Sequence, residues 1–132
     1  MFAMLEPADW YYYRTVKVGQ TVKFPCHTKL PEDVDWARFD LLNGSETFIY
    51  LGTHGPRDLG RDPRFKVLQK HQSHSLVIYN VTVDDSAYYR CAEDINRHFY
   101  RLNVQGNFMF YFRLCFRLHV FFSASKITKK ID

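Results

Sequence analysis

The stretch Asp84-Asp85-Ser86-Ala87-Tyr88-Tyr89-Arg90-Cys91 decides how the rest of the chain is read. It runs from an acidic, polar corner into a segment with the character of a β-strand. Tyr89 and Cys91 are two positions apart, so both side chains point to the same face of an extended strand. We therefore expect a polar corner followed by a strand that carries an inward tyrosine and an inward cysteine.

Residues upstream complete a pattern with this stretch. The set Cys26, Trp36, Asp85, Ala87, Tyr89 and Cys91, at these spacings, resembles the immunoglobulin superfamily, and its variable-type (V-set) branch in particular. A tyrosine two residues before the second cysteine matches the tyrosine corner of such domains, whose hydroxyl bonds to the backbone upstream. The resemblance covers about residues 14–104. It implies an all-β, immunoglobulin-like V-type sandwich of two antiparallel sheets with Greek-key connections.

The resemblance also implies a disulfide between Cys26 and Cys91 across the two sheets, with Trp36 packed on it and Tyr89 buried. Such a bridge closes a loop of about 65 residues and contributes on the order of 4 kcal/mol in the chain-entropy model. It requires an oxidising compartment, so we expect an extracellular or cell-surface location. A disulfide domain whose first residues show no signal peptide suggests that the native N-terminus is longer.

The length and the charge distribution indicate one domain. The 132 residues carry a formal net charge of +4, but residues 1–104 hold 13 of the 18 basic and 13 of the 14 acidic residues. The excess of positive charge therefore lies in the last 28 residues, and nucleic-acid binding is set aside. We divide the chain into a lead-in (1–9), an Ig-like V-type domain (10–105) and an aromatic, basic tail (106–132).

The tail is unlike the rest of the chain. Every even position from Phe108 to Phe122 is apolar, which favours a strand. A membrane helix is the competing interpretation, but the run is shorter than the ~20 residues needed and contains Arg113 and Arg117. A gene-model or splice extension is a third interpretation. Cys115, the odd cysteine, is a free thiol, an intermolecular link or an accident. Membrane association would need segments beyond this chain or this tail.

The expected strands follow from alternation and turn residues. The run Trp10-Tyr11-Tyr12-Tyr13 reads as a first strand or its approach, and its rings are expected to pack over one end of the sandwich, with a binding platform as the alternative. Asn43-Gly44 predicts a hairpin between residues 34–39 and 48–51. Further strands are expected at 64–68, 75–79 and 98–104, a loop with at most a short edge strand at 52–63, and a polar loop at 92–97.

Two observations refine the class. The 39 residues between Trp36 and Leu76, with their turn signals, leave room for the extra strands of the variable type. The last strand lacks the aromatic-Gly-x-Gly bulge of rearranged antigen receptors. The resemblance therefore implies a non-rearranging receptor or adhesion domain.

Catalysis has no support in the sequence. The six histidines are scattered, and His71 and His74 make at most a pair without a third metal ligand. Arg64 and Asp85 match the positions that form an ion pair closing the base of V-type sandwiches, which is a structural role. We expect no enzyme activity, no cofactor and no metal.

A binding surface is expected on the outside of one sheet. With Trp36, Ile49, Leu51, Tyr89, Cys91 and Tyr100 taken as inward, the alternate positions face out. These positions are Ala37, Phe39, Phe48, Tyr50, Arg90, Ala92, Phe99 and Arg101. Aromatic residues and arginine dominate binding hot spots, so Phe39, Phe48, Tyr50, Arg90, Phe99 and Arg101 are the candidate partner-binding residues. The alternative is that a neighbouring loop or the tail covers these rings, or that the assumed strand register has slipped.

The sequence therefore predicts a non-enzymatic, extracellular recognition module of the immune-receptor or adhesion type, which binds a protein partner of the same or another kind. Loop-mediated recognition of an antigen or glycan is one alternative. An intracellular structural Ig domain with reduced cysteines is another. Asn43 and Asn80 begin glycosylation sequons, which fits a secreted or surface glycoprotein.

Overall fold

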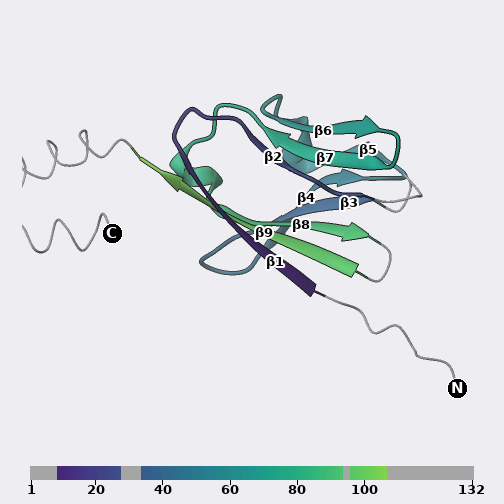
Figure 1. Cartoon of the computed structure of the whole chain (residues 1–132), viewed down its shortest axis with the longest axis horizontal. Helices are drawn as coiled ribbons and strands as arrows, with labels where there is room; N and C mark the ends of the chain where they lie inside the picture. Colours follow the sequence, from purple (N-terminus) through teal and green to yellow (C-terminus); the bar gives the residue numbers. More distant parts are fainter. Residues whose placement is uncertain (1–8, 28–33, 94–95, 107–132) are drawn as a thin grey trace, which may run out of the picture.

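The computed structural model describes residues 9–27, 34–93 and 96–106, which form two packed β-sheets (Figure 1). The strands are β1 (Asp9–Lys17), β2 (Val22–Phe24), β3 (Asp35–Phe39), β4 (Glu46–Leu51), β5 (Gly55–Pro56), β6 (Phe65–Lys70), β7 (Ser73–Ile78), β8 (Ala87–Glu93) and β9 (Asn96–Gln105). Short 3-10 turns, η2 (Asp58–Arg61) and η3 (Val83–Asp85), precede β6 and β8.

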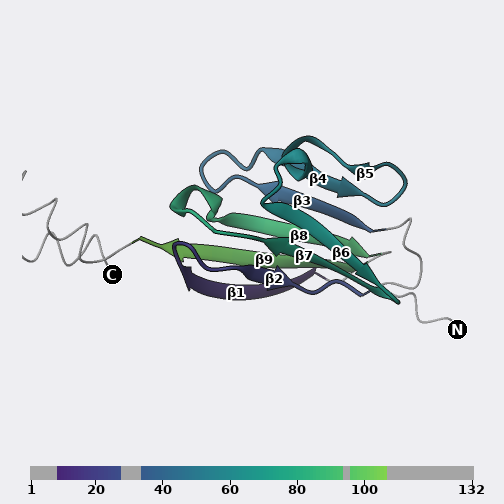
Figure 2. The same ribbon diagram turned by 90° about the horizontal axis from the view of Figure 1, so that it is seen from above.

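The larger sheet has the order β1-β9-β8-β3-β4-β5 and the smaller one the order β2-β7-β6. All strand pairs are antiparallel except β1 and β9, which run parallel along their whole shared length. Figure 2 shows β1 along the outside of β9, at the margin of the larger sheet. The all-β V-type architecture expected from the sequence is confirmed.

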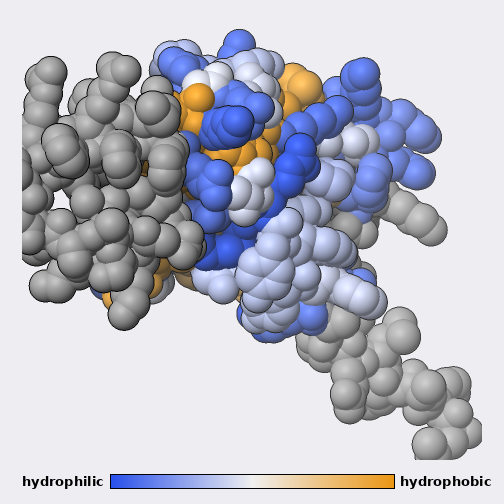
Figure 3. All heavy atoms as spheres, turned by 60° about the vertical axis from the view of Figure 1, so that its left-hand side comes forward, coloured by the Kyte–Doolittle hydropathy of each residue, from blue (hydrophilic) through white to orange (hydrophobic). Residues whose placement is uncertain are grey.

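The core lies between the sheets and is built from alternate residues of the facing strands. Its largest fully buried side chains are Trp36, Tyr89, Phe24, Ile49 and Leu76. Cys26 and Cys91 form a disulfide within this core, with their Cα atoms 6.2 Å apart. The bond joins the segment after β2 to β8 and so ties the two sheets together. On the view in Figure 3, the described surface is mostly hydrophilic, with a smaller hydrophobic area in its upper part.

The polar corner before β8 holds Tyr89 in place. The Tyr89 hydroxyl donates a 2.6 Å hydrogen bond to the carbonyl oxygen of Asp85, and burial raises the pKa of Tyr89. Asp85 in turn caps η3, because its carboxylate accepts from the backbone N–H of Thr82 at 2.8 Å. A buried phenol therefore has its partner inside the corner that positions it.

The hairpin expected at Asn43-Gly44 is present between β3 and β4. Phe39 pairs with Glu46, so the connection is longer than a two-residue turn. Gly44 takes a φ of +70° and donates to the carbonyl of Asp40 at 2.9 Å. The left-handed backbone at this position explains the glycine. The expected strands at 64–68 and 75–79 and the short edge strand within 52–63 are also confirmed.

The side chains of β4 do not alternate as the sequence predicts. The register shifts opposite Trp36 and Ala37, because Trp36 pairs with Tyr50 whereas Ala37 pairs with Phe48. Ile49 is the extra residue of this β-bulge. Tyr50 therefore shares the inner side with Trp36 and packs against the core, and Leu51 pairs with the outward Asp35. The expectation that Tyr50 faces out and Leu51 faces in is wrong.

The aromatic run near the N-terminus also differs from expectation. Trp10, Tyr11, Tyr12 and Tyr13 lie along β1 at the edge of the larger sheet and are 41–77% exposed. They do not cover an end of the sandwich, because parallel pairing with β9 spreads them along the strand.

The polar loop expected at 92–97 is shorter than predicted. β8 continues to Glu93 and β9 begins at Asn96, so ladder hydrogen bonding extends beyond the apolar residues. The expectations for the tail, including those for Cys115, concern residues outside the described ranges.

Candidate functional site

The outer side of the larger sheet carries a continuous band of rings and guanidinium groups. Strand register brings together residues of β1, β3, β4, β8 and β9 that share this side. We call the band the aromatic–arginine face and define it as Tyr11, Tyr13, Phe39, Phe48, Tyr88, Arg90, Phe99 and Arg101.

Arg90 lies at the centre of the aromatic–arginine face. Its guanidinium carbon is 5.0 Å from the centroid of the Phe39 ring, and its Nη2 is 3.0 Å from Oε1 of Glu46. Only 15% of the Arg90 side chain is exposed. Among the described residues its Nε has no hydrogen-bond partner. A cation held between a ring and a carboxylate keeps a fixed orientation, so this part of the face is ordered before any partner arrives.

Phe99 connects β9 to its neighbours. Its ring stacks on Tyr11 with centroids 5.0 Å apart and meets Phe39 at 6.1 Å. The Arg97 guanidinium lies 5.9 Å from the Phe99 centroid and forms two hydrogen bonds with Asp9, at 2.8 and 2.9 Å. The rings of three strands therefore make a single packed row.

Arg101 and Tyr88 extend this row toward the other end of the sheet. The two residues are opposite each other in the β8–β9 register, and the guanidinium carbon of Arg101 is 5.7 Å from the Tyr88 centroid. Arg101 Nη1 also donates to the carbonyl of Leu102 at 2.5 Å. Tyr88 is also opposite Phe39 of β3 in the β3–β8 register.

Five of the six residues selected as partner-binding from the sequence lie together here. They are Phe39, Phe48, Arg90, Phe99 and Arg101. Tyr50 does not join them because of the bulge in β4. The sequence reasoning missed Tyr88, although it is two positions before Arg90 and alternation could have found it. It also missed Tyr11 and Tyr13, because the pairing of β1 with Phe99 and Arg101 is a long-range contact.

Arg64 and Asp85 lie apart from the aromatic–arginine face, beside η3. Arg64 Nη1 and Nη2 donate to the two Asp85 carboxylate oxygens at 2.7 and 3.1 Å, and Nη1 also lies 3.2 Å from the Asn80 carbonyl. Burial by itself raises the pKa of Asp85, but hydrogen bonds from Arg64 and from the Thr82 N–H outweigh it, and the pKa is lowered. The hydrogen bond to Asp85 raises the pKa of Arg64.

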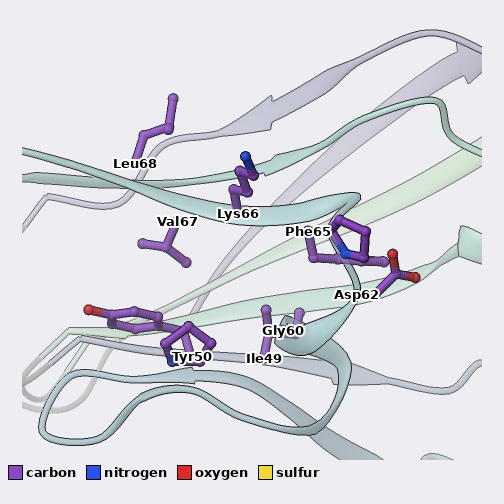
Figure 4. Close-up of a pocket in the computed structure, with 10 residues that line it drawn as sticks. Ile49, Tyr50, Gly60, Asp62, Phe65, Lys66, Val67 and Leu68 are labelled. Atoms are coloured by element: carbon purple, nitrogen blue, oxygen red, sulfur yellow. The ribbon is translucent and has the colours of Figure 1, made fainter.

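A cavity of about 300 Å³ opens between β4, β5 and β6 (Figure 4). Figure 4 shows Tyr50 and Val67 pointing toward one another across the gap, with Leu68 pointing away. The Tyr50 hydroxyl accepts a hydrogen bond from Gln69 of β6. Gly60 of η2 fits tightly at the floor, because a Cβ there would lie 1.9 Å from the Ile49 carbonyl oxygen. The lining of the cavity includes only two charged residues, Asp62 and Lys66, so the cavity offers few groups for chemistry.

Both sequon asparagines are exposed. Asn43 lies in the β3–β4 hairpin, where its side-chain oxygen accepts from the Ser45 N–H at 2.8 Å, and Asn80 lies just after β7 with a φ of +50°. Either position leaves room for a glycan.

Within the described ranges, His, Cys, Asp and Glu residues form no group that could hold a metal ion. A separate observation concerns membranes: the described residues include no helix with the length and apolar character to cross a bilayer.

The sandwich, its disulfide and its tyrosine corner define the class of the protein, and comparison with known families agrees. The immunoglobulin V-set domain model matches residues 12–120 of this chain. The chain therefore belongs to the V-set immunoglobulin domains, a family of recognition and adhesion modules. No curated protein was found to match the sequence.

Proposed function

We propose that this V-set domain is a non-enzymatic recognition module of the cell surface or extracellular space, of the immune-receptor or adhesion type. It binds a protein partner through the aromatic–arginine face. The observation that carries the proposal is the row of packed rings and guanidinium groups on the side of the larger sheet that the smaller sheet leaves uncovered.

The composition of this face suits a protein partner. Aromatic residues and arginine are enriched at the centres of protein interfaces, where their truncation costs the most binding energy. The rings already stack on one another, and Arg90 is held by Phe39 and Glu46. Side chains that are ordered beforehand lose little conformational entropy on binding. Arg101, at one end of the row, suits an acidic group on the partner.

The disulfide and the exposed sequons support an extracellular location. Mass spectrometry of the protein from its native source tests this part. We expect glycan on Asn43 or Asn80 and an oxidised Cys26–Cys91 pair, whereas free thiols without glycan would contradict it.

The binding proposal is tested by a screen of the full chain against extracellular proteins, itself included, followed by variants. The double variant Phe39→Ala/Phe99→Ala should weaken partner binding by about 30-fold or more, since a central aromatic contributes about 2 kcal/mol. The matched control is Tyr79→Ala, which removes a partly exposed ring that follows β7 of the other sheet. Full binding by the double variant, with loss of binding in variants of the β8–β9 connection, would assign recognition to the loops.

A further inference from the structure

We propose that the edge of β1 that no strand of the described residues covers is a self-association site for a second copy of this chain. Two β1 strands would pair antiparallel about a two-fold axis at Tyr13, so that the larger sheets of both copies become one. This inference concerns a sheet edge rather than the aromatic–arginine face, and it does not rest on the proposed function.

The first argument compares the four sheet edges of the described chain. Exposed edges are normally protected by short strands, proline, bulges or lysine. β5 has two residues and includes Pro56, and β2 has three residues followed by Pro25. β6 carries Lys66 and Lys70. β1 has nine residues in unbroken register with β9, contains no proline, and carries its one lysine, Lys17, at its last position. It is therefore the long edge on which these devices are weakest.

The second argument is the direction of the peptide groups of β1. The Val18 N–H bonds to the Gln105 carbonyl of β9, whereas the Lys17 N–H bonds to the side chain of Gln20 at 2.8 Å. Peptide groups of alternate residues point to opposite sides of a strand, so the even positions of β1 bond to β9. The peptide groups of Tyr11, Tyr13 and Thr15 point to the open edge.

The third argument is that β1 is complementary to itself. Antiparallel pairing centred on Tyr13 places Tyr11 opposite Thr15, so all three outward-pointing residues join in hydrogen-bonded pairs. The same register places Asp9 opposite Lys17. Negative and positive ends therefore meet in both halves of the dimer, and cross-strand pairs of opposite charge stabilise a sheet.

Side chains also fit this register. Tyr12 would lie opposite Arg14 on the inner side, within reach of a cation–π contact. Tyr13 would meet its own copy on the outer side. It is 77% exposed and so gains most from being covered. Aromatic cross-strand pairs are among those that contribute to sheet stability. Charge, hydrogen bonding and exposed ring area thus point to a second copy as the occupant of this edge.

The test measures the oligomeric state of the full chain by sedimentation velocity, in a Cys115→Ser background that excludes an unrelated disulfide. Tyr13→Pro removes an N–H that points to the open edge and leaves the β1–β9 hydrogen bonds intact. We expect dimerisation to weaken by about 30-fold or more, because two hydrogen bonds of about 1 kcal/mol each are lost. Tyr13→Thr is the matched control, because it keeps the N–H, and it should still form dimers.

Charge reversal tests the register. Lys17→Asp and Asp9→Lys should each dimerise more weakly than the parent chain, because like charges then face each other at both ends. An equal mixture of the two variants restores both opposite-charge pairs and should recover dimers. Asp9 also pairs with Arg97, so recovery in the mixture, rather than the loss in either variant alone, is the deciding result.

A cross-link gives a direct readout. In the same background, Tyr13→Cys should form an intermolecular disulfide, since Cα atoms of a hydrogen-bonded antiparallel pair are about 5.5 Å apart. Thr15→Cys is also at an exposed position, but the two copies of residue 15 would be too far apart to bond. A monomeric parent chain, a dimer that Tyr13→Pro leaves intact, or equal cross-linking at both positions would each overturn the proposal. A dimer lost in Phe39→Ala/Phe99→Ala but kept in Tyr13→Pro would assign self-association to the aromatic–arginine face instead.

Discussion

At the scale of single residues, Asp85 connects three features of the corner. Its carboxylate is 4% exposed and accepts two hydrogen bonds from Arg64 and one from the Thr82 N–H. Its backbone carbonyl accepts from the Tyr89 hydroxyl. One residue therefore fixes η3, the entrance to β8 and the ion pair that the sequence resemblance implies.

Arg64→Gln should lower the free energy of unfolding at pH 7 by about 2–4 kcal/mol, because it leaves a buried carboxylate with too few donors. The pKa of Asp85 is lowered in the folded state, so its stabilisation is present above about pH 4 and is lost as the pH falls through the folded pKa. Urea unfolding at pH 7 and pH 3 should therefore show a smaller difference from the parent at pH 3. Arg61→Gln, at an exposed position of η2, is the control. An equal difference at both values would contradict the ion-pair account.

His74 is the buried histidine of the described chain. Its side chain is on the inner side of β7 with Leu76 and Ile78, and neither ring nitrogen has a hydrogen-bond partner among the described residues. Burial, followed by the charge of His27, lowers the pKa of His74. The folded state therefore resists protonation at a pH where the unfolded chain accepts a proton.

The parent domain should lose stability as the pH falls below about 6.5, by at most about 1.4 kcal/mol per pH unit from this residue. His74→Leu should flatten this part of the profile, because it removes the titrating group. Chemical unfolding between pH 7.5 and 5.5 measures both slopes. His71→Gln, an exposed change in the same β6–β7 turn, should keep the parent slope, and a parent-like slope in His74→Leu would disprove the assignment.

At the scale of elements, the bulge in β4 changes what Tyr50 does. Tyr50 packs against the core and receives a hydrogen bond from Gln69 of the opposite sheet. Tyr50→Ala should therefore lower the free energy of unfolding by about 1.5–3 kcal/mol, as expected for a partly buried ring. Phe48→Ala, two positions earlier and on the outer side, should cost less than about 1 kcal/mol. Thermal or urea unfolding of both variants decides between this arrangement and simple alternation, which places both rings on the outer side and so predicts similarly small losses of stability.

β1 shows how an element acquires its role from its neighbour. The strand pairs with β9 from end to end, and this pairing places Tyr11 and Tyr13 in the same layer as Phe99 and Arg101. Within the part of the chain that the structure describes, no strand pairs with its other edge. A single strand thus contributes rings to the aromatic–arginine face and peptide groups to the proposed self-association edge.

At the scale of the whole molecule, both proposed surfaces belong to the larger sheet. Antiparallel pairing through β1 about a two-fold axis perpendicular to the sheet keeps the outer sides of both copies on the same side. A dimer would therefore present two aromatic–arginine faces side by side, and two linked sites raise the effective affinity for a partner that also carries two sites. The disulfide holds the smaller sheet against the other side, so it does not cover this face.

Much of this fold could be predicted from the sequence by itself. The cysteine pair, Trp36 and the tyrosine corner have local spacings that match one family, and strand alternation located most of β3, β6, β7 and β9. Phe39, Arg90, Phe99 and Arg101 could be assigned to the outer side because each lies in regular alternation with an inward neighbour. Local periodicity is sufficient where a strand is regular.

Only the tertiary structure decided the rest. The bulge in β4 depends on its pairing with β3, and no local pattern marks the residue at which the register shifts. The position of β1 depends on parallel pairing with a strand almost 90 residues away, as the register of Asp9 with Arg97 shows. Contacts at that separation leave no trace in the periodicity of either strand. The rings of β1 therefore gained their place on the face, and the open edge beside it, from the folding of the whole chain.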